Sequence, residues 1–199
     1  MTALADIDLV LASTSRYRRE LLARFTSSFR TLSPEVDESP LPDEAPTTLA
    51  IRLAAAKARA VAAQCAHALI VGSDQIADLD GRILGKPGIA DVARQQLAAC
   101  SGRGVIFHTA VCLIDTRQQP AQIHTGIDTT RVVFRNLHED EIARYIAAEK
   151  PLDCAASFKA EGLGIALFER IESADPTALI GLPLIVLGRL LRAAGVALP

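Results

Sequence analysis

Two long β-like stretches, residues 104–115 and 121–134, constrain the fold of this chain more than any other feature. Both are rich in β-branched and apolar residues, and the short connection between them predicts that they pair as antiparallel neighbours. Before them, short apolar strands at 9–12 and 69–71 alternate with helical segments. Alternation followed by a hairpin is typical of an α/β domain with a mixed, twisted sheet and flanking helices. We therefore predict one such domain over residues 1–199.

Signals at the ends of elements predict where the helices and turns lie. Glycine commonly ends a helix, which places one helix end at Ser101-Gly102. The pattern Asn136-x-x-Glu139 resembles a capping box that opens another helix, and Asp80-Gly81 is typical of a hairpin turn. We expect a loop at 33–47, a strand over 164–171, and helices at 15–25, 48–66, 90–100, from Asn136 to before Pro151, and 183–194.

Charge and cysteine usage argue against several classes of protein. The formal net charge of the 199 residues is −2, so a broad electrostatic surface for nucleic acid is not expected. The apolar runs are too short, or too interrupted by charge, to span a bilayer. We see no secretory signal pattern, no CxxC pair and no histidine at metal-ligand spacing from a cysteine. We therefore expect a cytoplasmic protein without a structural zinc site, whose thiols stay reduced: Cys65, Cys100, Cys112 and Cys154.

The junction between the first strand and the first helix predicts an anion site. Three apolar residues follow Arg18 at i+3, i+4 and i+7, so Arg18 lies on the stripe that should face the core. The hydroxyls of Ser13 and Ser15 and the free N–H groups of the first helical turn share this space. Phosphate is the natural ligand, because a guanidinium fork matches its oxygens. The alternative is that Arg18 reaches out to solvent.

Further candidate residues lie where loops follow strands. Asp74 comes directly after the strand 69–71, and ligands in open α/β sheets gather beyond the carboxyl ends of strands. An acid there can bind a metal or activate water, although a turn aspartate is the alternative. Glu38 adds an acid in the 33–47 loop. Lys86, between a glycine and a proline, could contact phosphate although its spacing is not that of a P-loop, whereas Lys57 stands alone among alanines and is typical of an exposed lysine.

A polar loop before the 164–171 strand carries two more candidates, Lys159 and Glu161, and its small residues would let a ligand approach closely. None of the four histidines pairs with a serine or cysteine in a recognisable nucleophile arrangement. The sequence thus offers basic groups for phosphates and acids for a metal and water, without a covalent nucleophile. This set predicts metal-assisted hydrolysis of a polyphosphate.

Seven motifs then carry a family resemblance over nearly the whole chain: LVLASTSRYRRELL, PEVDE, RLAAAKA, VGSDQ, GRILGKP, FKAEGLG and LIGLPL. In this order and approximate spacing they resemble the Maf family of nucleotide pyrophosphatases. The resemblance implies an elongated α/β fold with two lobes around a central cleft, often as a homodimer. It also implies cleavage of a nucleoside triphosphate to the monophosphate and pyrophosphate, with a divalent metal such as Mg²⁺ or Mn²⁺.

Carried over by position, the resemblance assigns roles to residues already singled out. The family's essential arginine matches Arg18, its loop acid matches Glu38, and its lysines match Lys57 and Lys86. The acid that accepts a proton matches Asp74. Asp74 and Glu38 are the residues that the resemblance implies as metal ligands, and which of the two contacts the ion directly stays open.

Three further positions resemble the branch of the family that hydrolyses 7-methyl-GTP: Tyr17, Gln75 and Glu161. Methylation at N7 leaves guanine cationic, so a tyrosine face can attract it, and a carboxylate can accept hydrogen bonds from its N–H groups. In many relatives a proline and an arginine stand where this chain has Arg16 and Tyr17. Tyr17 packing on Leu21 is the structural alternative. Two other functions stay open, a pyrophosphatase for dTTP or UTP and a nucleotide-binding regulator of cell division or septum formation.

Overall fold

The structure, a computed structural model, describes residues 2–198. The strands in this part of the chain are β1 Thr2–Ala3, β2 Leu9–Ala12, β3 Arg30–Leu32, β4 Leu69–Leu79, β5 Arg82–Ile83, β6 Gly104–Asp115, β7 Gln122–Phe134, β8 Phe168–Glu172 and β9 Val196–Ala197. The α-helices are α1 Arg16–Leu22, α2 Pro46–Ala62, α3 Ala90–Cys100, α4 Glu139–Glu149 and α5 Leu184–Ala193. Four 3₁₀ turns join them: η1 Leu4–Asp6, η2 Ala155–Ser157, η3 Leu163–Leu167 and η4 Ala178–Ile180.

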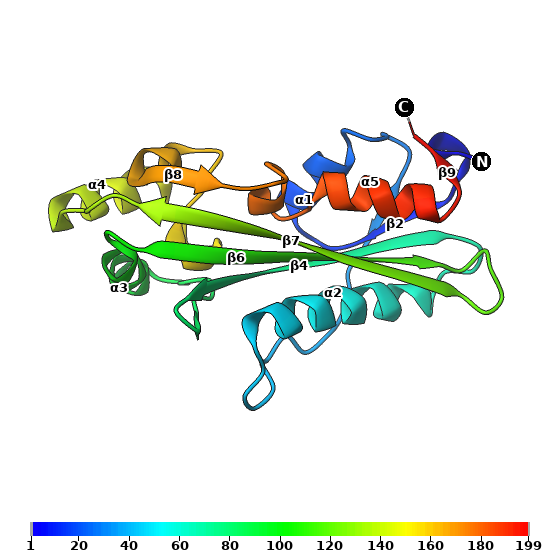
Figure 1. The fold of residues 1–199 in the computed structure, drawn as a ribbon, viewed down its shortest axis with the longest axis horizontal. Helices are drawn as coiled ribbons and strands as arrows, with labels where there is room; N and C mark the ends of the chain where they lie inside the picture. Colours follow the sequence, from blue (N-terminus) through cyan, green and yellow to red (C-terminus); the bar gives the residue numbers. More distant parts are fainter. Residues whose placement is uncertain (1, 199) are drawn as a thin grey trace.

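The main sheet has the order β3-β2-β4-β6-β7-β8, with β5 paired on β4 (Figure 1). β2 runs parallel to β3 and β4, whereas β4, β6, β7 and β8 pair antiparallel in sequence. A separate parallel pair, β1 and β9, joins the two ends of the chain. The predicted mixed sheet and the predicted β6–β7 hairpin are therefore confirmed.

Helices cover both faces of the sheet and form two lobes. Figure 1 shows α2 along one face, α1 and α5 along the other, and α3, α4 and β8 together at one end. Buried apolar side chains follow this division. One cluster packs around α3 and α4, a second under α1 and α5, and a third between α2 and the sheet. No helix among residues 2–198 combines the length and the hydropathy needed to cross a membrane.

The strand that carries Asp74 is much longer than predicted. Residues 69–71 were expected to form the strand, but β4 continues to Leu79, so Asp74 lies within the strand and the prediction that it follows the strand end is wrong. Pairing with β6 extends without a break across Gly72, Ser73 and Asp74. The parallel neighbour β2 stops opposite Gly72. Asp74 therefore still lies beyond the carboxyl end of β2, which is what opens space beside it.

Several element ends differ from the predicted ones. The first helix stops at Leu22 rather than residue 25, and the second spans 46–62 rather than 48–66, with Pro46 in its first turn. The backbone N–H of His138 donates to Glu141 Oε2 at 3.5 Å, and His138 is the N-terminal cap residue of α4. The helix therefore begins two residues later than the Asn136 pattern predicts. Residues 163–167 form η3, and only 168–172 form β8.

The predicted positions of one helix end, one hairpin turn and the last helix are confirmed. The helix 90–100 has its predicted bounds, with Gly102 at φ +69° just beyond it. Asp80 and Gly81 both have positive φ and join β4 to β5 as a hairpin turn. The last helix starts at Leu184 with Pro183 as its N-terminal cap residue.

Candidate active site

A cavity of about 850 Å³ lies between the two lobes. Apolar side chains from both sides enclose it, including Phe107 and Phe158 from the α3–α4 cluster and Leu49 and Leu53 from the α2 cluster. Most of the residues singled out in the sequence line it: Ser13, Ser15, Tyr17, Arg18, Glu38, Lys57, Asp74, Gln75, Lys86 and Glu161. Segments far apart in the chain are thus brought to one space.

Lys57 is at the centre of the site and bridges two acids. Its Nζ lies 2.6 Å from Asp74 Oδ1 and 2.6 Å from Glu38 Oε1, and the residue is only 5% exposed. The prediction of an exposed lysine is wrong, because α2 packs its alanine face closely on β4. A Cβ at Gly72 would collide with the backbone of Ala54 and Ala58. A buried ammonium needs anionic partners, and these two carboxylates supply them.

Arg18 faces the cavity rather than solvent. Its side chain is 15% exposed, and its Nη2 lies 3.9 Å from Asp74 Oδ1. The backbone N–H of Arg18 is capped by Ser15 Oγ, and its Nε donates to the Gly181 carbonyl at 2.9 Å. Burial lowers the pKa of Arg18, while the charges of Asp74 and Glu38 oppose this shift. The inward orientation that helical periodicity predicted is confirmed.

The carbonyl that holds Arg18 is itself fixed by buried groups that the sequence did not single out. Ser73 Oγ donates to the Gly181 and Ala110 carbonyls at 3.1 and 2.8 Å. Thr109 Oγ1 donates to the Ala178 carbonyl at 3.0 Å. The carbonyls of Gly181, within the LIGLPL motif, and of Ala178, just before it, are therefore held in place, a role that residue types alone do not reveal.

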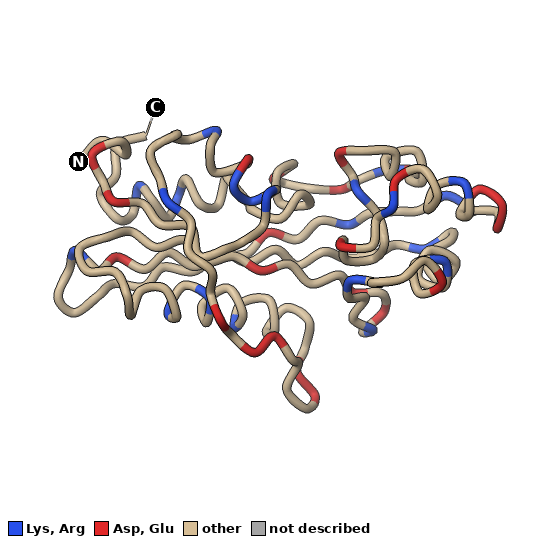
Figure 2. The backbone as a smooth tube through the Cα atoms, turned by 180° about the vertical axis from the view of Figure 1, so that it is seen from behind, with Lys and Arg blue, Asp and Glu red and all other residues tan. Residues whose placement is uncertain are grey.

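Positive charge gathers around Glu38, on the loop between β3 and α2. Burial alone would raise the pKa of this carboxyl, but the hydrogen bond from Lys57 and the charges of Lys57, Lys86 and Arg18 outweigh burial and lower it. Figure 2 shows acidic positions following one another along this loop, beside the α2 face.

Ser13 Oγ accepts from the N–H of Ser15 at 3.1 Å, so its own O–H is left to donate. Cations and donors together suit a bound phosphate.

The remaining candidates divide into two groups. Tyr17 and Glu161 line the cavity together with Asp153 and Cys154, two residues that sequence reasoning missed although they belong to the same polar segment. Lys159 does not line it. Its Nζ lies 3.4 Å from the Glu149 carbonyl and 3.8 Å from Glu149 Oε1, so its predicted contact with substrate stays a prediction.

Gln75 lines the cavity with one end of its amide already engaged. Its Nε2 donates to the carbonyls of Ala178 and Leu179 at 2.9 and 3.0 Å, and lies 3.0 Å from Thr109 Oγ1. Only its Oε1 is left for a ligand. Gln75 can therefore accept a hydrogen bond from a bound base but not donate one.

Comparison with known proteins identifies the family. The sequence profile described as Maf-like protein matches residues 8–194. The chain belongs to the Maf-like protein family. Among related proteins, the 7-methyl-GTP pyrophosphatase of Xanthomonas campestris pv. campestris (strain 8004) is 58% identical to this Maf-like chain over 191 residues, covering 96% of this chain and 98% of that protein. The protein of the same name from Aromatoleum aromaticum is 54% identical over 191 residues, covering 96% and 97%. The one from Burkholderia thailandensis is 56% identical over 190 residues, covering 94% and 87%.

Among solved structures, the Maf-like chain is similar to the Ham1 protein of Staphylococcus aureus. The TM-score is 0.48 at 15% sequence identity, over 94% of this chain and 97% of that one. This likeness bears on neither substrate nor mechanism.

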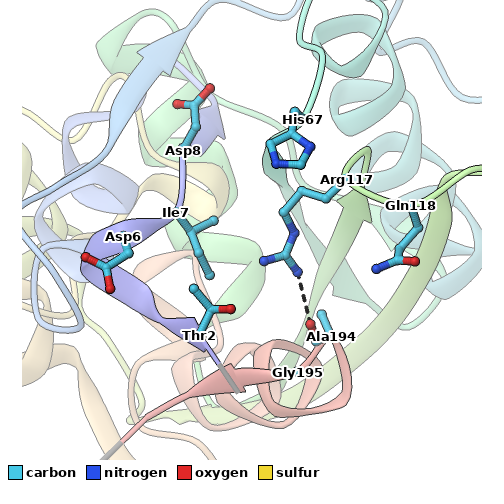
Figure 3. Close-up of a pocket in the computed structure, with 9 residues that line it drawn as sticks. All are labelled: Thr2, Asp6, Ile7, Asp8, His67, Arg117, Gln118, Ala194 and Gly195. Atoms are coloured by element: carbon cyan, nitrogen blue, oxygen red, sulfur yellow. Dashed lines mark hydrogen bonds between the residues drawn. The ribbon is translucent and has the colours of Figure 1, made fainter.

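A second, smaller cavity of about 390 Å³ lies near the β1–β9 pair, away from the residues discussed so far (Figure 3). The Arg117 guanidinium points into it. Arg117 Nη2 donates to the Ala194 carbonyl at 3.0 Å and pairs with Asp115 Oδ2 at 2.8 Å, so its charge is already compensated. None of the predicted site residues of this Maf-like protein lines this cavity.

Asp74 and Glu38 were predicted to hold a divalent metal, and their arrangement bears on how they could do so. Within residues 2–198, no group of three or more His, Cys, Asp or Glu side chains is placed to hold an ion. Mg²⁺ is commonly held by one or two carboxylates together with substrate phosphates and water. Two carboxylates that share one lysine at the phosphate-binding side of the cavity fit this mode, in which the ion arrives with the nucleotide.

Proposed function

We propose that this chain hydrolyses 7-methyl-GTP to 7-methyl-GMP and pyrophosphate. The observation that carries the proposal is the convergence of Arg18, Lys57 and Asp74 in one cavity. The proteins named 7-methyl-GTP pyrophosphatase, identical to this chain at 54–58% of positions over nearly its whole length, support the same substrate. Tyr17 and Glu161 beside this centre add an aromatic ring and a carboxylate for a cationic base.

The chemistry is a displacement at the α-phosphorus. Asp74 orients a water molecule and accepts its proton, while the water oxygen forms a bond to the α-phosphorus. The bond from that phosphorus to the oxygen bridging the α- and β-phosphates breaks, and pyrophosphate leaves with the electron pair. Lys57 occupies only Oδ1 of Asp74, which leaves the lone pairs of Oδ2 for other partners, the water among them. Arg18, Lys57 and Lys86 stabilise the charge that grows on the leaving group.

A panel of nucleotides tests the substrate. With purified protein we expect kcat/KM for 7-methyl-GTP to exceed that for GTP, dTTP and UTP by about tenfold or more, because one cation–π contact in a partly desolvated site supports such a ratio. Pyrophosphate release measures each reaction. Higher kcat/KM for dTTP or UTP would replace the substrate in this proposal. Tight nucleotide binding without pyrophosphate release would favour the regulatory alternative instead.

We also propose Mg²⁺ or Mn²⁺ as the metal, held by Asp74 and Glu38 with the triphosphate. The ion would neutralise phosphate charge and polarise the phosphorus towards attack. Chelation with EDTA is expected to abolish pyrophosphate release, and added Mg²⁺ or Mn²⁺ to restore it. A thermal unfolding curve in EDTA serves as the control for folding. Full turnover in excess EDTA would refute the metal requirement.

Cytoplasmic location and a homodimer complete the proposal. All four cysteines are free, and the cytoplasm is the compartment that keeps thiols reduced. The homodimer follows from the family resemblance, and light scattering on the purified protein measures it.

A further inference from the structure

Charge is separated within the cavity. Arg18 interacts electrostatically with Asp74 and Glu38, and Glu38 interacts in turn with Lys57 and Lys86. We call these five residues the phosphate end. Tyr17, although adjacent to Arg18 in α1, interacts instead with Asp153, Cys154 and Glu161. We call Tyr17, Asp153, Cys154 and Glu161 the base end. The two sets share no member, so a ligand that spans the cavity meets three cations together with two acids at one end, and acids without an ion-pair partner among the described residues at the other.

The carboxylates of the base end lack a cationic partner. Among residues 2–198, no Lys, Arg or His nitrogen lies within 4.0 Å of a carboxylate oxygen of Asp153 or Glu161, and both residues are exposed and line the cavity. Lys159 is close enough for its charge to act on Cys154, but its ammonium is engaged by Glu149. Within residues 2–198, no ion pair therefore neutralises Asp153 or Glu161. Arg16, which lines the cavity beside Tyr17, is exposed and paired with Glu20.

The neutral groups of the base end report the same field. Burial, and then the charges of Asp153 and Glu161, raise the pKa of Cys154 to about 12, so its thiol adds no charge. Burial, Cys154 and the same two acids raise the pKa of Tyr17 to about 12. Burial opposes any charged form here, whereas the part of both shifts that comes from Asp153 and Glu161 is a negative field that stabilises a cation. Gln75 adds an acceptor through its Oε1.

These observations carry an inference that rests on the proposed function and extends it. We propose that the cavity selects the positive charge of the base rather than the methyl group on N7. The substrate class is then purine nucleoside triphosphates alkylated on a ring nitrogen so that the base is cationic, with hydrolysis at the same bond. Both the guanine and the adenine members of this class offer a cationic face to Tyr17 and N–H donors to the carboxylates.

Matched pairs of nucleotides test the inference. We measure kcat/KM by pyrophosphate release for 7-methyl-GTP and 7-ethyl-GTP against GTP, and for 1-methyl-ATP against ATP. Each cationic nucleotide is expected to exceed its neutral parent by about tenfold or more. Added salt is expected to lower these ratios, because exposed carboxylates are screened.

Variants separate charge from shape. Asp153→Asn and Glu161→Gln keep the size of each side chain and remove its charge, so each is expected to lower the ratio of 7-methyl-GTP to GTP at least threefold. Asp91→Asn, an exposed acid on α3 outside the cavity, is the matched control and leaves the ratio unchanged.

The outcomes distinguish this inference from the function on which it rests. If 7-methyl-GTP is preferred to GTP but 7-ethyl-GTP and 1-methyl-ATP are no better than their parents, selection by charge is wrong and the proposed function stands. An unchanged ratio in both variants also overturns the inference. If 7-methyl-GTP yields no pyrophosphate at all, the proposed function itself fails.

Discussion

Asp74→Asn is expected to lower pyrophosphate release about a hundredfold or more, the usual loss when a general base is removed. The residue is 6% exposed, and its Oδ1 lies 2.6 Å from Lys57 Nζ and 3.9 Å from Arg18 Nη2. An amide in its place can still accept a hydrogen bond from Lys57 through its oxygen. It cannot accept a proton from water at neutral pH. The variant should therefore bind nucleotide and release little product.

Asp78→Asn is the matched control for this variant. Asp78 lies on the same strand and the same face, accepts a hydrogen bond from the N–H of Gly81 and lies 3.7 Å from His108, but does not line the cavity. Its turnover should match that of the unmodified protein. Circular dichroism and thermal unfolding establish that both variants are folded. Turnover of Asp74→Asn within a factor of about three of the unmodified protein would remove Asp74 from the proton transfer.

The strands show what local sequence can and cannot predict. The 90–100 helix and the β6–β7 hairpin were predicted because periodicity and end signals agree along each segment. The sequence Gly72-Ser73-Asp74-Gln75 instead resembles a turn, since glycine, serine and aspartate favour turns. In the structure β6 pairs with all four positions, and this non-local pairing overrides the local preference.

The site shows the same limit at the level of single residues. The inward orientation of Arg18 follows from the apolar stripe of its own helix, so the sequence predicts it. The burial of Lys57 depends on Asp74 and Glu38, which approach it only when α2 packs on β4. No local pattern distinguishes such a lysine from an exposed one, and only the family resemblance placed it in the site. The engagement of Gln75 Nε2 by η4 is likewise a contact between segments about a hundred residues apart.

Lys57→Met is expected to lower both activity and stability. Loss of a preorganised cation at the phosphate end should lower pyrophosphate release about a hundredfold or more. Without the ammonium, Asp74 and Glu38 face each other as like charges, one of them buried. Removing one partner of a buried ion pair typically costs about 3–5 kcal/mol, and we expect the lower end, because Arg18 still lies near Asp74 and Glu38 is largely solvated.

The stability loss in Lys57→Met should depend on pH with a definite sign. Lys57 is a main reason why the pKa of Glu38 is lowered below its ordinary 4.5, so in the unmodified protein Glu38 contributes stability above that pH. This contribution disappears as pH falls through the lowered pKa. The difference in unfolding free energy between variant and unmodified protein should therefore be larger at pH 7 than at pH 3, measured by urea titration. Arg59→Met, an exposed cation on the same helix, should show almost no loss at either pH. A pH-independent loss in Lys57→Met would mean that packing, rather than the two carboxylates, keeps Lys57 in the core.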